Sequence, residues 1–306
     1  MLTCDQIEEY KKNGLLVIEN VLTEEEIDTA RRGLHNQLHM HGIDYDKVLS
    51  GEQILDEGPR LKSTASKFFY SKWKMDVHLN EKVYESMKQL MEATYSSGKV
   101  KGFEHPFGSS SDILACIDRV CWRVPDIIRA EGGLELHIDR NPFDPYLFKH
   151  NGLKRWRPIQ AFVTLTDSYG SESGGLRVVP GFHHEIDSYF TKSKPAIESD
   201  GEFYRLNSLS HVSLARKLQP IMAPKGSLVC WDNRLPHATC AKLTGTDTRE
   251  VVYVGWMPNI TLNKSHAQNQ LIDIRANKST DSHFADRDWE ESDLTELQKK
   301  LLDIKN

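Results

Sequence analysis

A histidine and an aspartate stand two residues apart in segment 134–139, which reads Leu-Glu-Leu-His-Ile-Asp. Apolar and polar residues alternate through this segment, and a period of two predicts a β-strand. His137 and Asp139 then share one face of the strand, while Leu136 and Ile138 share the other. A neutral imidazole and a carboxylate placed in this way can bind the same metal ion.

A second histidine, His237, follows the apolar run 227–231 and a short turn. It is far from Asp139 in the chain, but a barrel fold can return it beside the first strand. Two histidines and one carboxylate on one side of an ion leave three coordination positions open, as in non-haem Fe(II) oxygenases. A cosubstrate and O2 can coordinate together at those positions.

Arg249 stands twelve residues after His237 and precedes the apolar run 251–256. The planar fork of an arginine suits the far carboxylate of a dicarboxylate cosubstrate, and the hydroxyl of Thr239 can reach the same carboxylate. Taken alone, each histidine is also typical of a buried core residue, and Arg249 is also typical of the surface. The combination of these residues favours a metal-dependent site.

The composition narrows the classes of function. The chain has 306 residues, of which 39% are hydrophobic and 27% are charged, as is ordinary for a globular protein with a sizeable core. The formal net charge is −5, so nucleic acid is not an expected partner. No apolar run approaches the ~20 residues of a membrane span, and the first residues turn polar at once. We therefore expect neither a membrane span nor a signal peptide.

The cysteines indicate the compartment. There are five, an odd number, and none of them forms a Cys-x-x-Cys pair. A disulfide framework and a zinc ribbon are therefore not expected, and a reducing environment fits best. The last residues do not match a Ser-Lys-Leu peroxisomal signal, so we expect a cytoplasmic protein.

Two capping boxes indicate helices near the N-terminus. Thr3 with Gln6 begins a helix that ends at Gly14, and Thr23 with Glu26 begins another that runs to about residue 38. Between them, the apolar run 15–18 predicts a buried strand. Apolar residues at helical spacing predict a further helix over 82–94. We interpret these helices as packing elements.

From about residue 118 the sequence pattern changes to short runs of strand-forming residues separated by glycine and proline. Many short strands with turn signals between them predict a sandwich or a barrel. The charged segment 281–306 predicts a solvated helix with Leu294, Leu297 and Leu301 on one face. The expected strands are 120–124, 134–139, 159–165, 176–179, 227–231 and 251–256.

Four segments resemble the phytanoyl-CoA dioxygenase family of Fe(II)- and 2-oxoglutarate-dependent oxygenases. They are the N-terminal segment 2–27, the His-x-Asp at 137–139, the Gly-Gly-Leu…Pro-Gly-Phe-His segment 174–183, and the distal segment 237–249. Together they span about residues 1–256, and the last fifty residues carry no likeness. The Pro-Gly-x-His turn is fairly specific to this family, whereas many oxygenase families share the metal triad.

The resemblance implies a mainly β fold with flanking helices, a double-stranded β-helix of the jelly-roll or cupin-like barrel type. We expect a single oxygenase domain over 1–306. Its parts would be a mostly helical N-terminal support (1–117), the barrel core (118–258) and a C-terminal helical extension (259–306).

The resemblance also implies the site residues and the cofactors. His137, Asp139 and His237 would bind Fe(II), and Arg249 with Thr239 would bind the C5 carboxylate of 2-oxoglutarate. The enzyme would consume O2, hydroxylate a C–H bond of a small molecule, and release succinate and CO2. Asp139 argues against the halogenase branch of such enzymes, in which the carboxylate is missing so that chloride can bind iron.

The chain departs from the family pattern at several positions. Ile138 stands where a polar residue is common, Val251 where a serine is common, and Phe162 with Gln160 where a tryptophan is common. The cosubstrate pocket is therefore expected to be lined differently, with Gln160 among its residues.

Further candidates lie near the expected triad. Arg123, Trp122 and Phe162 are candidates for contact with the substrate, although a salt bridge is an alternative for Arg123. We interpret His183 and His184 as structural. The alternative to an enzyme is a non-catalytic barrel that binds a metal or a carboxylate ligand.

Overall fold

The structure is a computed structural model of the chain. It describes residues 1–55, 68–96, 98–130, 132–140, 142, 148–150, 153–192, 204–206, 209–278 and 286–305. The α-helices are α1 (Cys4–Asn13), α2 (Glu24–Met40), α3 (Tyr45–Ser50), α4 (Lys72–His78), α5 (Glu81–Ala93), α6 (Ile186–Lys192), α7 (Val212–Ala215), α8 (Thr261–Arg275) and α9 (Glu296–Leu301). Two short 3-10 helices are η1 (Phe182–His184) and η2 (Glu291–Asp293).

The strands form two five-stranded antiparallel sheets and one hairpin. The major sheet has the order β1-β10-β6-β12-β2, the minor sheet β8-β3-β11-β7-β9, and the hairpin pairs β4 with β5. The strands are β1 (Leu15–Ile18), β2 (Ile113–Arg123), β3 (His137–Ile138), β4 (Phe148–His150), β5 (Leu153–Arg155), β6 (Ile159–Thr164), β7 (Leu176–Val178), β8 (Tyr204–Arg205), β9 (Gln219–Pro220), β10 (Leu228–Asp232), β11 (His237–Thr239) and β12 (Arg249–Pro258).

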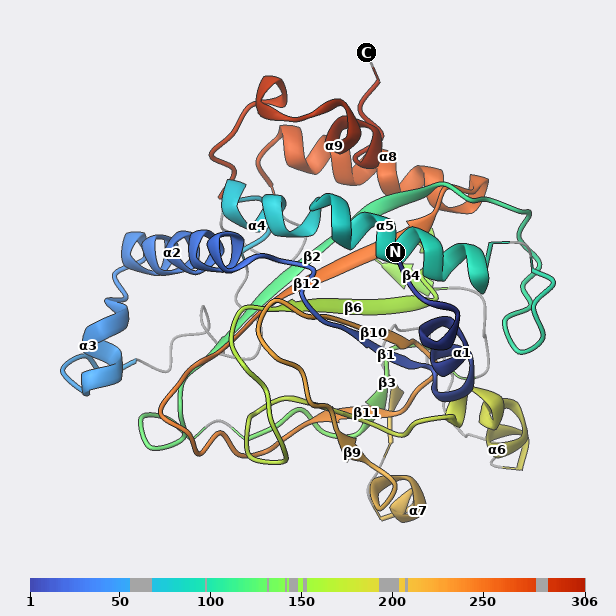
Figure 1. Ribbon diagram of the computed structural model, residues 1–306, viewed down its shortest axis with the longest axis horizontal. Coiled ribbons are helices and arrows are strands. Elements are labelled where there is room, and N and C mark those ends of the chain that lie inside the picture. Colours follow the sequence, from blue (N-terminus) through green and yellow to red (C-terminus); the bar gives the residue numbers. More distant parts are fainter. Residues whose placement is uncertain are drawn as a thin grey trace.

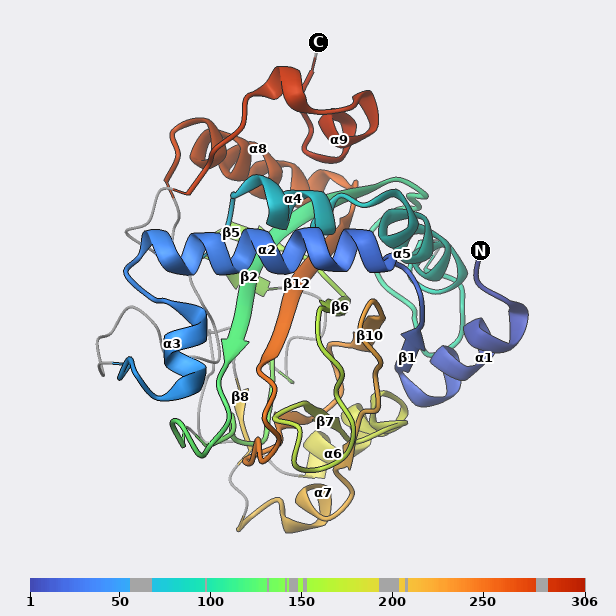
Figure 2. The same cartoon turned by 60° about the vertical axis from the view of Figure 1, so that its left-hand side comes forward.

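The two sheets and the helices form layers. Helices α2, α4, α5, α8 and α9 lie on one side of the major sheet, and the minor sheet lies on the other with α6 and α7 (Figures 1 and 2). The prediction of a mainly β fold with flanking helices is therefore confirmed. Within the described residues the strand pairing does not close the two sheets into one continuous barrel.

The N-terminal elements follow the predicted signals closely. Thr3 and Thr23 each accept a hydrogen bond from the backbone N–H three residues on, which completes both capping boxes. Gly14 ends α1 with a φ of +67°, a conformation that glycine adopts without steric cost. Strand β1 then pairs with β10, so the N-terminal part contributes a strand to the major sheet as well as helices.

Alternate residues of the major sheet face the helices or the minor sheet, as the pleat of a strand requires. On β12, Val252 and Trp256 belong to the helix-covered core, whereas Val251 faces the other way. A register shift in the pairing of β12 with β2 acts as a β-bulge and reverses the facing of β2. As a result Trp122 faces the helices, and Arg123 pairs in register with Arg249 on the opposite face.

The C-terminal segment differs from its expectation. Residues 281–285 lie outside the described residues, and α9 is a short helix of six residues. Leu294 and Leu301 are buried in the core beneath the helices, whereas Leu297 is only partly buried. The segment is thus packed against the main body instead of being a solvated helix.

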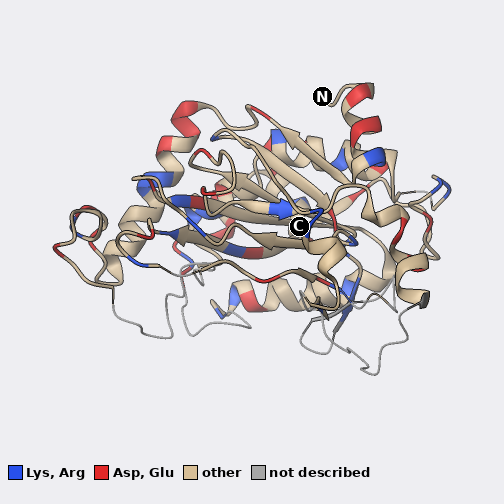
Figure 3. Cartoon of the chain, turned by 90° about the horizontal axis from the view of Figure 1, so that it is seen from below, with Lys and Arg blue, Asp and Glu red and all other residues tan. Residues whose placement is uncertain are grey.

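The distribution of charged residues over the structure agrees with what the composition indicates. Basic and acidic residues are interspersed along the chain when it is viewed from below (Figure 3). Among the described residues, no helix has the length and apolar character needed to cross a membrane.

Candidate metal centre and cosubstrate pocket

The two histidines of the expected triad face each other across the minor sheet. His137 on β3 and His237 on β11 are paired in register, and their ring centroids are 4.1 Å apart. Asp139 follows β3 directly. One ligand atom from each of the three residues lies within 4.8 Å of the others, so the structure brings together the group that sequence reasoning selected.

Backbone carbonyls orient both imidazoles. Nδ1 of His137 lies 2.6 Å from the carbonyl oxygen of Glu135, and Nδ1 of His237 lies 3.0 Å from that of Leu235. Because a carbonyl oxygen only accepts, each Nδ1 is the protonated donor, which leaves Nε2 as the metal-binding nitrogen. The Nε2 atoms lie 3.3 Å and 3.5 Å from the two carboxylate oxygens of Asp139.

Asp139 is held as an anion. Burial raises the pKa of this carboxyl, but the hydrogen bonds and charges of the two histidines outweigh it and hold the pKa well below its usual range. The side-chain amide of Gln160 also donates to Asp139 Oδ2 at 2.7 Å. Two imidazole nitrogens and one ionised carboxylate form a donor set that fits divalent iron.

Arg249 is a buried cation on the sheet face that carries Gln160. It is 4% exposed, and its Nη1 donates to the sulfur of Cys121 at 2.9 Å. Its guanidinium lies 5.6 Å from the ring centroid of Phe162. Among the described residues its Nε has no hydrogen-bond partner and no carboxylate forms an ion pair with it, while the hydroxyl of Tyr253 interacts with the guanidinium. A buried guanidinium in this state suits the second carboxylate of a dicarboxylate ligand.

Thr239 lies on the same face of β11 as His237. Its hydroxyl oxygen accepts a hydrogen bond from the backbone N–H of Leu134, which leaves the hydroxyl proton available to donate. That Thr239 and Arg249 bind the same carboxylate stays a prediction.

The three residues predicted to contact the substrate lie in three different environments. Arg123 donates to the carbonyls of Cys240 and Ala241 and pairs with Asp126 at 2.8 Å, as the salt-bridge alternative expects. Phe162 lies beside Arg249. Trp122 lies on the far face of β2, where its ring is 6.5 Å from that of Tyr45, so the structure does not bring it to the metal centre.

Three further residues lie beside the residues of the candidate site, and sequence reasoning missed them. Trp231 is 5.6 Å from His237 between ring centroids and pairs in register with Gln160. Tyr253 packs edge-on against Phe162, and its burial raises the pKa of its hydroxyl to about 12. The sulfur of Cys121 accepts a hydrogen bond from Arg249. Counting by two from Arg249 would have found Tyr253, because alternate residues share a face.

The Pro-Gly-Phe-His turn is hydrogen-bonded to the end of helix α1. His183 and His184 each place Nε2 3.0 Å from the carbonyl oxygen of Lys11, at the end of α1. The N–H of Gly181 donates to the carbonyl of Asn13. The turn therefore holds the end of α1, in agreement with the interpretation of both histidines as structural.

The family model of phytanoyl-CoA dioxygenase (PhyH) matches residues 10–251, which is most of the chain and includes the three candidate metal ligands, Thr239 and Arg249. The chain belongs to the phytanoyl-CoA dioxygenase family. A curated relative from Dictyostelium discoideum, named "Putative phytanoyl-CoA dioxygenase", is 21% identical over 88% of this chain and 80% of its own length.

Solved structures share the fold of this family member. GlcNAc Inducible Gene 2 from Candida albicans has a TM-score of 0.76 at 16% identity, over 99% of this chain and 76% of its own. HygX from Streptomyces hygroscopicus, solved with nickel, 2-oxoglutarate and hygromycin B bound, has a TM-score of 0.51 at 16% identity, over 84% of this chain and 88% of its own. The carbocyclase SnoK from nogalamycin biosynthesis has a TM-score of 0.50 at 16% identity, over 84% of both chains.

Proposed function

We propose that this protein is an Fe(II)- and 2-oxoglutarate-dependent dioxygenase with a double-stranded β-helix core. It hydroxylates a C–H bond of a small molecule and releases succinate and CO2. The observation that carries the proposal is the convergence of two carbonyl-oriented imidazoles and one ionised carboxylate, which Gln160 joins to the sheet face that carries the buried Arg249. HygX, bound to nickel and 2-oxoglutarate, lends support at the level of the fold.

In this proposal the residues of the chain hold and orient the reactants. His137, Asp139 and His237 would bind Fe(II), which when bound supplies the activation of O2 and the oxidation of the C–H bond. Gln160 fixes the orientation of the Asp139 carboxylate through its 2.7 Å hydrogen bond. An ionised carboxylate at this position occupies the place that chloride needs, so we propose hydroxylation and not halogenation.

The far end of 2-oxoglutarate would lie against Arg249 and Thr239. The guanidinium donates to the C5 carboxylate, and the Thr239 hydroxyl donates its free proton to the same group. Phe162 and Trp231 form apolar walls that exclude water from this end. Arg123 stays a proposed substrate contact, whereas Trp122 is left out because it faces the helices.

The five cysteines support work in a reducing compartment, such as the cytoplasm. All five are free thiols, and four of them are buried. None is part of a disulfide that an oxidising environment would form.

The decisive experiment measures succinate release from 2-oxoglutarate with Fe(II) and ascorbate. We expect His137→Ala and Asp139→Ala each to lower this turnover by more than ~100-fold, because each removes a metal ligand. His39→Ala is the control, since His39 is exposed at the end of α2 and should keep wild-type turnover. Zn(II) binding without affinity for 2-oxoglutarate would instead support the non-catalytic alternative. A folded protein that binds no metal would contradict both.

A further inference from the structure

Strand β12 has one residue that is open to the space between the two sheets. All ten residues of β12 are described, and nine of them are buried, because the strand lies between β6 and β2. The exception is Tyr253, which is partly exposed. Its side chain packs against the apolar cluster that contains Phe162 of the major sheet and Val178 of the minor sheet. Tyr253 therefore faces the interior between the sheets, at a place that solvent can reach.

Tyr253 lies beside Arg249 on this inner face. Alternate residues of a strand share a face, and the pairing of β12 with β6 is regular over residues 251–253. The ring centroid of Phe162 lies 5.6 Å from the Arg249 guanidinium and 5.9 Å from the Tyr253 ring. The hydroxyl of Tyr253 interacts with the guanidinium. The three side chains thus form one group on β6 and β12.

The hydroxyl of Tyr253 has a proton to donate. Burial raises the pKa of this hydroxyl to about 12, so the phenol is neutral at pH 7. A guanidinium only donates, so the phenol oxygen is the acceptor in its interaction with Arg249. Among the described residues, Arg249 is the one hydrogen-bond partner of this hydroxyl. The phenolic proton is therefore available to a ligand.

The group formed by Arg249, Phe162 and Tyr253 matches a carboxylate. Arg249 is buried, its Nη1 donates to the sulfur of Cys121, and no carboxylate of the described residues pairs with it. The guanidinium and the phenol offer donors and one positive charge, side by side. A carboxylate only accepts, and its two oxygens can accept from both groups at once. A neutral amide or hydroxyl would satisfy the donors and leave the charge unpaired.

We propose that Tyr253 donates its phenolic hydrogen bond to the carboxylate that Arg249 binds, and thereby selects a cosubstrate that has a second carboxylate. The inference rests on the proposed function, in which this group is the C5 carboxylate of 2-oxoglutarate. Tyr253 is then a cosubstrate-binding residue in addition to Arg249 and Thr239. Its contact is at the end of the cosubstrate far from the metal, so it affects affinity for the cosubstrate.

Titration calorimetry on the Mn(II)-loaded protein tests the proposal without turnover. Two ligands are compared: 2-oxoglutarate, and oxalate, which can chelate a metal but has no far carboxylate. Tyr253→Phe should weaken 2-oxoglutarate binding about 10-fold, because it removes a hydrogen bond to a charged group. The affinity for oxalate should stay within about twofold of the wild type, since that ligand does not reach Tyr253.

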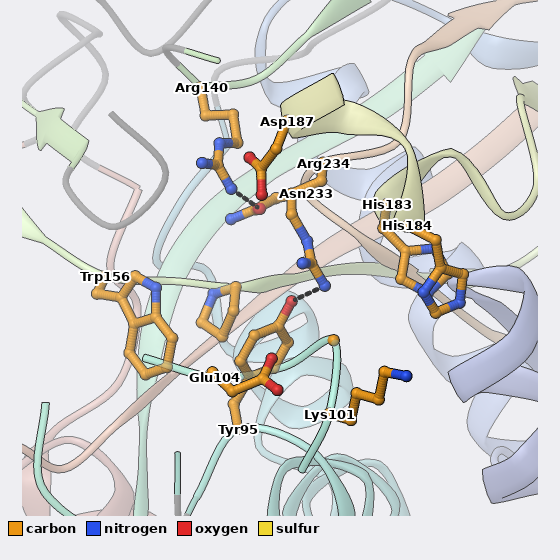
Figure 4. Close-up of a pocket in the computed structure, with 12 residues that line it drawn as sticks. Tyr95, Lys101, Glu104, Arg140, Trp156, His183, His184, Asp187, Asn233 and Arg234 are labelled. Atoms are coloured by element: carbon orange, nitrogen blue, oxygen red, sulfur yellow. Dashed lines mark hydrogen bonds between the residues drawn. The ribbon is translucent and has the colours of Figure 1, made fainter. Parts of the chain in front are cut away.

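Tyr95→Phe is the matched control, because Tyr95 is another buried tyrosine whose hydroxyl meets an arginine. Arg234 donates to this hydroxyl at 2.8 Å, in a cavity of about 530 Å³ (Figure 4). Of the described residues that line this cavity, none is Tyr253 or a candidate metal ligand. The hydroxyl also donates to the buried Asp232, so the control should lose stability and keep wild-type affinity for both ligands. It therefore separates a loss of stability from a loss of affinity.

The outcomes distinguish this inference from the proposed function. Wild-type affinity for 2-oxoglutarate in Tyr253→Phe, together with a loss in Arg249→Gln, would overturn the inference and leave the proposed function intact. An equal loss for 2-oxoglutarate and oxalate in Tyr253→Phe would also overturn it, because Tyr253 would then only support the fold of the site. A wild-type protein that binds Mn(II) but no 2-oxoglutarate would contradict the proposed function, and the inference with it.

Discussion

Gly174 lies against the two arginines that face each other across β12 and β2. Its φ is +64°, and a Cβ at this position would lie 3.2 Å from Arg123 Nη1 and 3.5 Å from Arg249 Cδ. Glycine is therefore needed here for both its backbone conformation and its lack of a side chain. Gly170 has a similar φ of +81°, but a Cβ there would meet nothing within 4 Å.

Gly174→Ala should impair cosubstrate binding, because its methyl group crowds Arg123 Nη1, and Arg123 lies in register with Arg249 at the end of the proposed pocket. Both Gly174→Ala and Gly170→Ala should lose about 1 kcal/mol of unfolding free energy from the left-handed backbone. Only Gly174→Ala should also raise the KM for 2-oxoglutarate, by about fivefold if roughly 1 kcal/mol of binding is lost. Urea unfolding and succinate release measure the two effects. An equal KM in both variants would contradict the prediction.

The sequence was sufficient for the triad and insufficient for its surroundings. His137, Asp139 and His237 were selected from residue type, spacing and the family resemblance, and the structure brings them together. Whether Arg123 or Trp122 faces the site depended on the bulge in β2, which arises from pairing with a distant strand. The hydrogen bond from Gln160 to Asp139 joins residues of different sheets, so the sequence could not predict it either.

Among the elements, helix α4 contains a buried charge. Lys74 is 0% exposed, and its Nζ has no hydrogen-bond partner among the described residues. Burial lowers the pKa of Lys74 to about 8, and the carboxylates of Asp118 and Asp286 only partly oppose this. A charged lysine at neutral pH therefore destabilises the fold.

Lys74→Met should raise the free energy of unfolding at pH 7, by about 1 to 3 kcal/mol. The folded pKa lies below the unfolded value, so between pH 8 and about 10.5 the unfolded wild type binds more protons and wild-type stability rises with pH. The advantage of Lys74→Met should thus shrink across this window. Urea titrations at pH 7, 9 and 10.5 measure it. Lys72→Met is the control, because Lys72 is on the same helix but partly exposed and paired with Asp76. A constant difference at all three pH values would contradict the prediction.

The lengths of helices α1 and α2 and of strands β1, β6, β7 and β10 were predicted well, whereas those of β2, β3, β12 and the C-terminal helix were not. Capping residues are local signals, and they placed α1 and α2 within a few residues. Strand limits depend on which partner is present. The expected strand 134–139 is reduced to β3 (His137–Ile138), because only these residues pair in register with β11 and β8. Conversely, β2 and β12 are longer than expected, since they pair with each other along ten or more residues.

On the scale of the whole molecule, one hydrophobic core joins the two ends of the chain. It contains Tyr10 from α1, residues of every strand of the major sheet, and Trp289 and Leu302 near the C-terminus. The carboxylate of Asp286 accepts hydrogen bonds from the backbone N–H groups of Phe69 and Tyr70. The C-terminal segment lies beyond the family match, yet it is packed like the rest of the molecule.

Trp289→Ala should therefore destabilise the whole fold and not the C-terminal segment alone. Trp289 is 4% exposed, and its indole N–H donates to the carbonyl of Tyr70, so its removal leaves both a cavity and an unpaired carbonyl. We expect a loss of about 3 to 5 kcal/mol in unfolding free energy, whereas Ile272→Ala on the exposed face of α8 should change it by less than about 0.5 kcal/mol. Urea unfolding followed by both far-UV circular dichroism and tryptophan fluorescence should give one shared midpoint in wild type and variant. Two separated transitions would instead show that the C-terminal segment unfolds independently of the sheets.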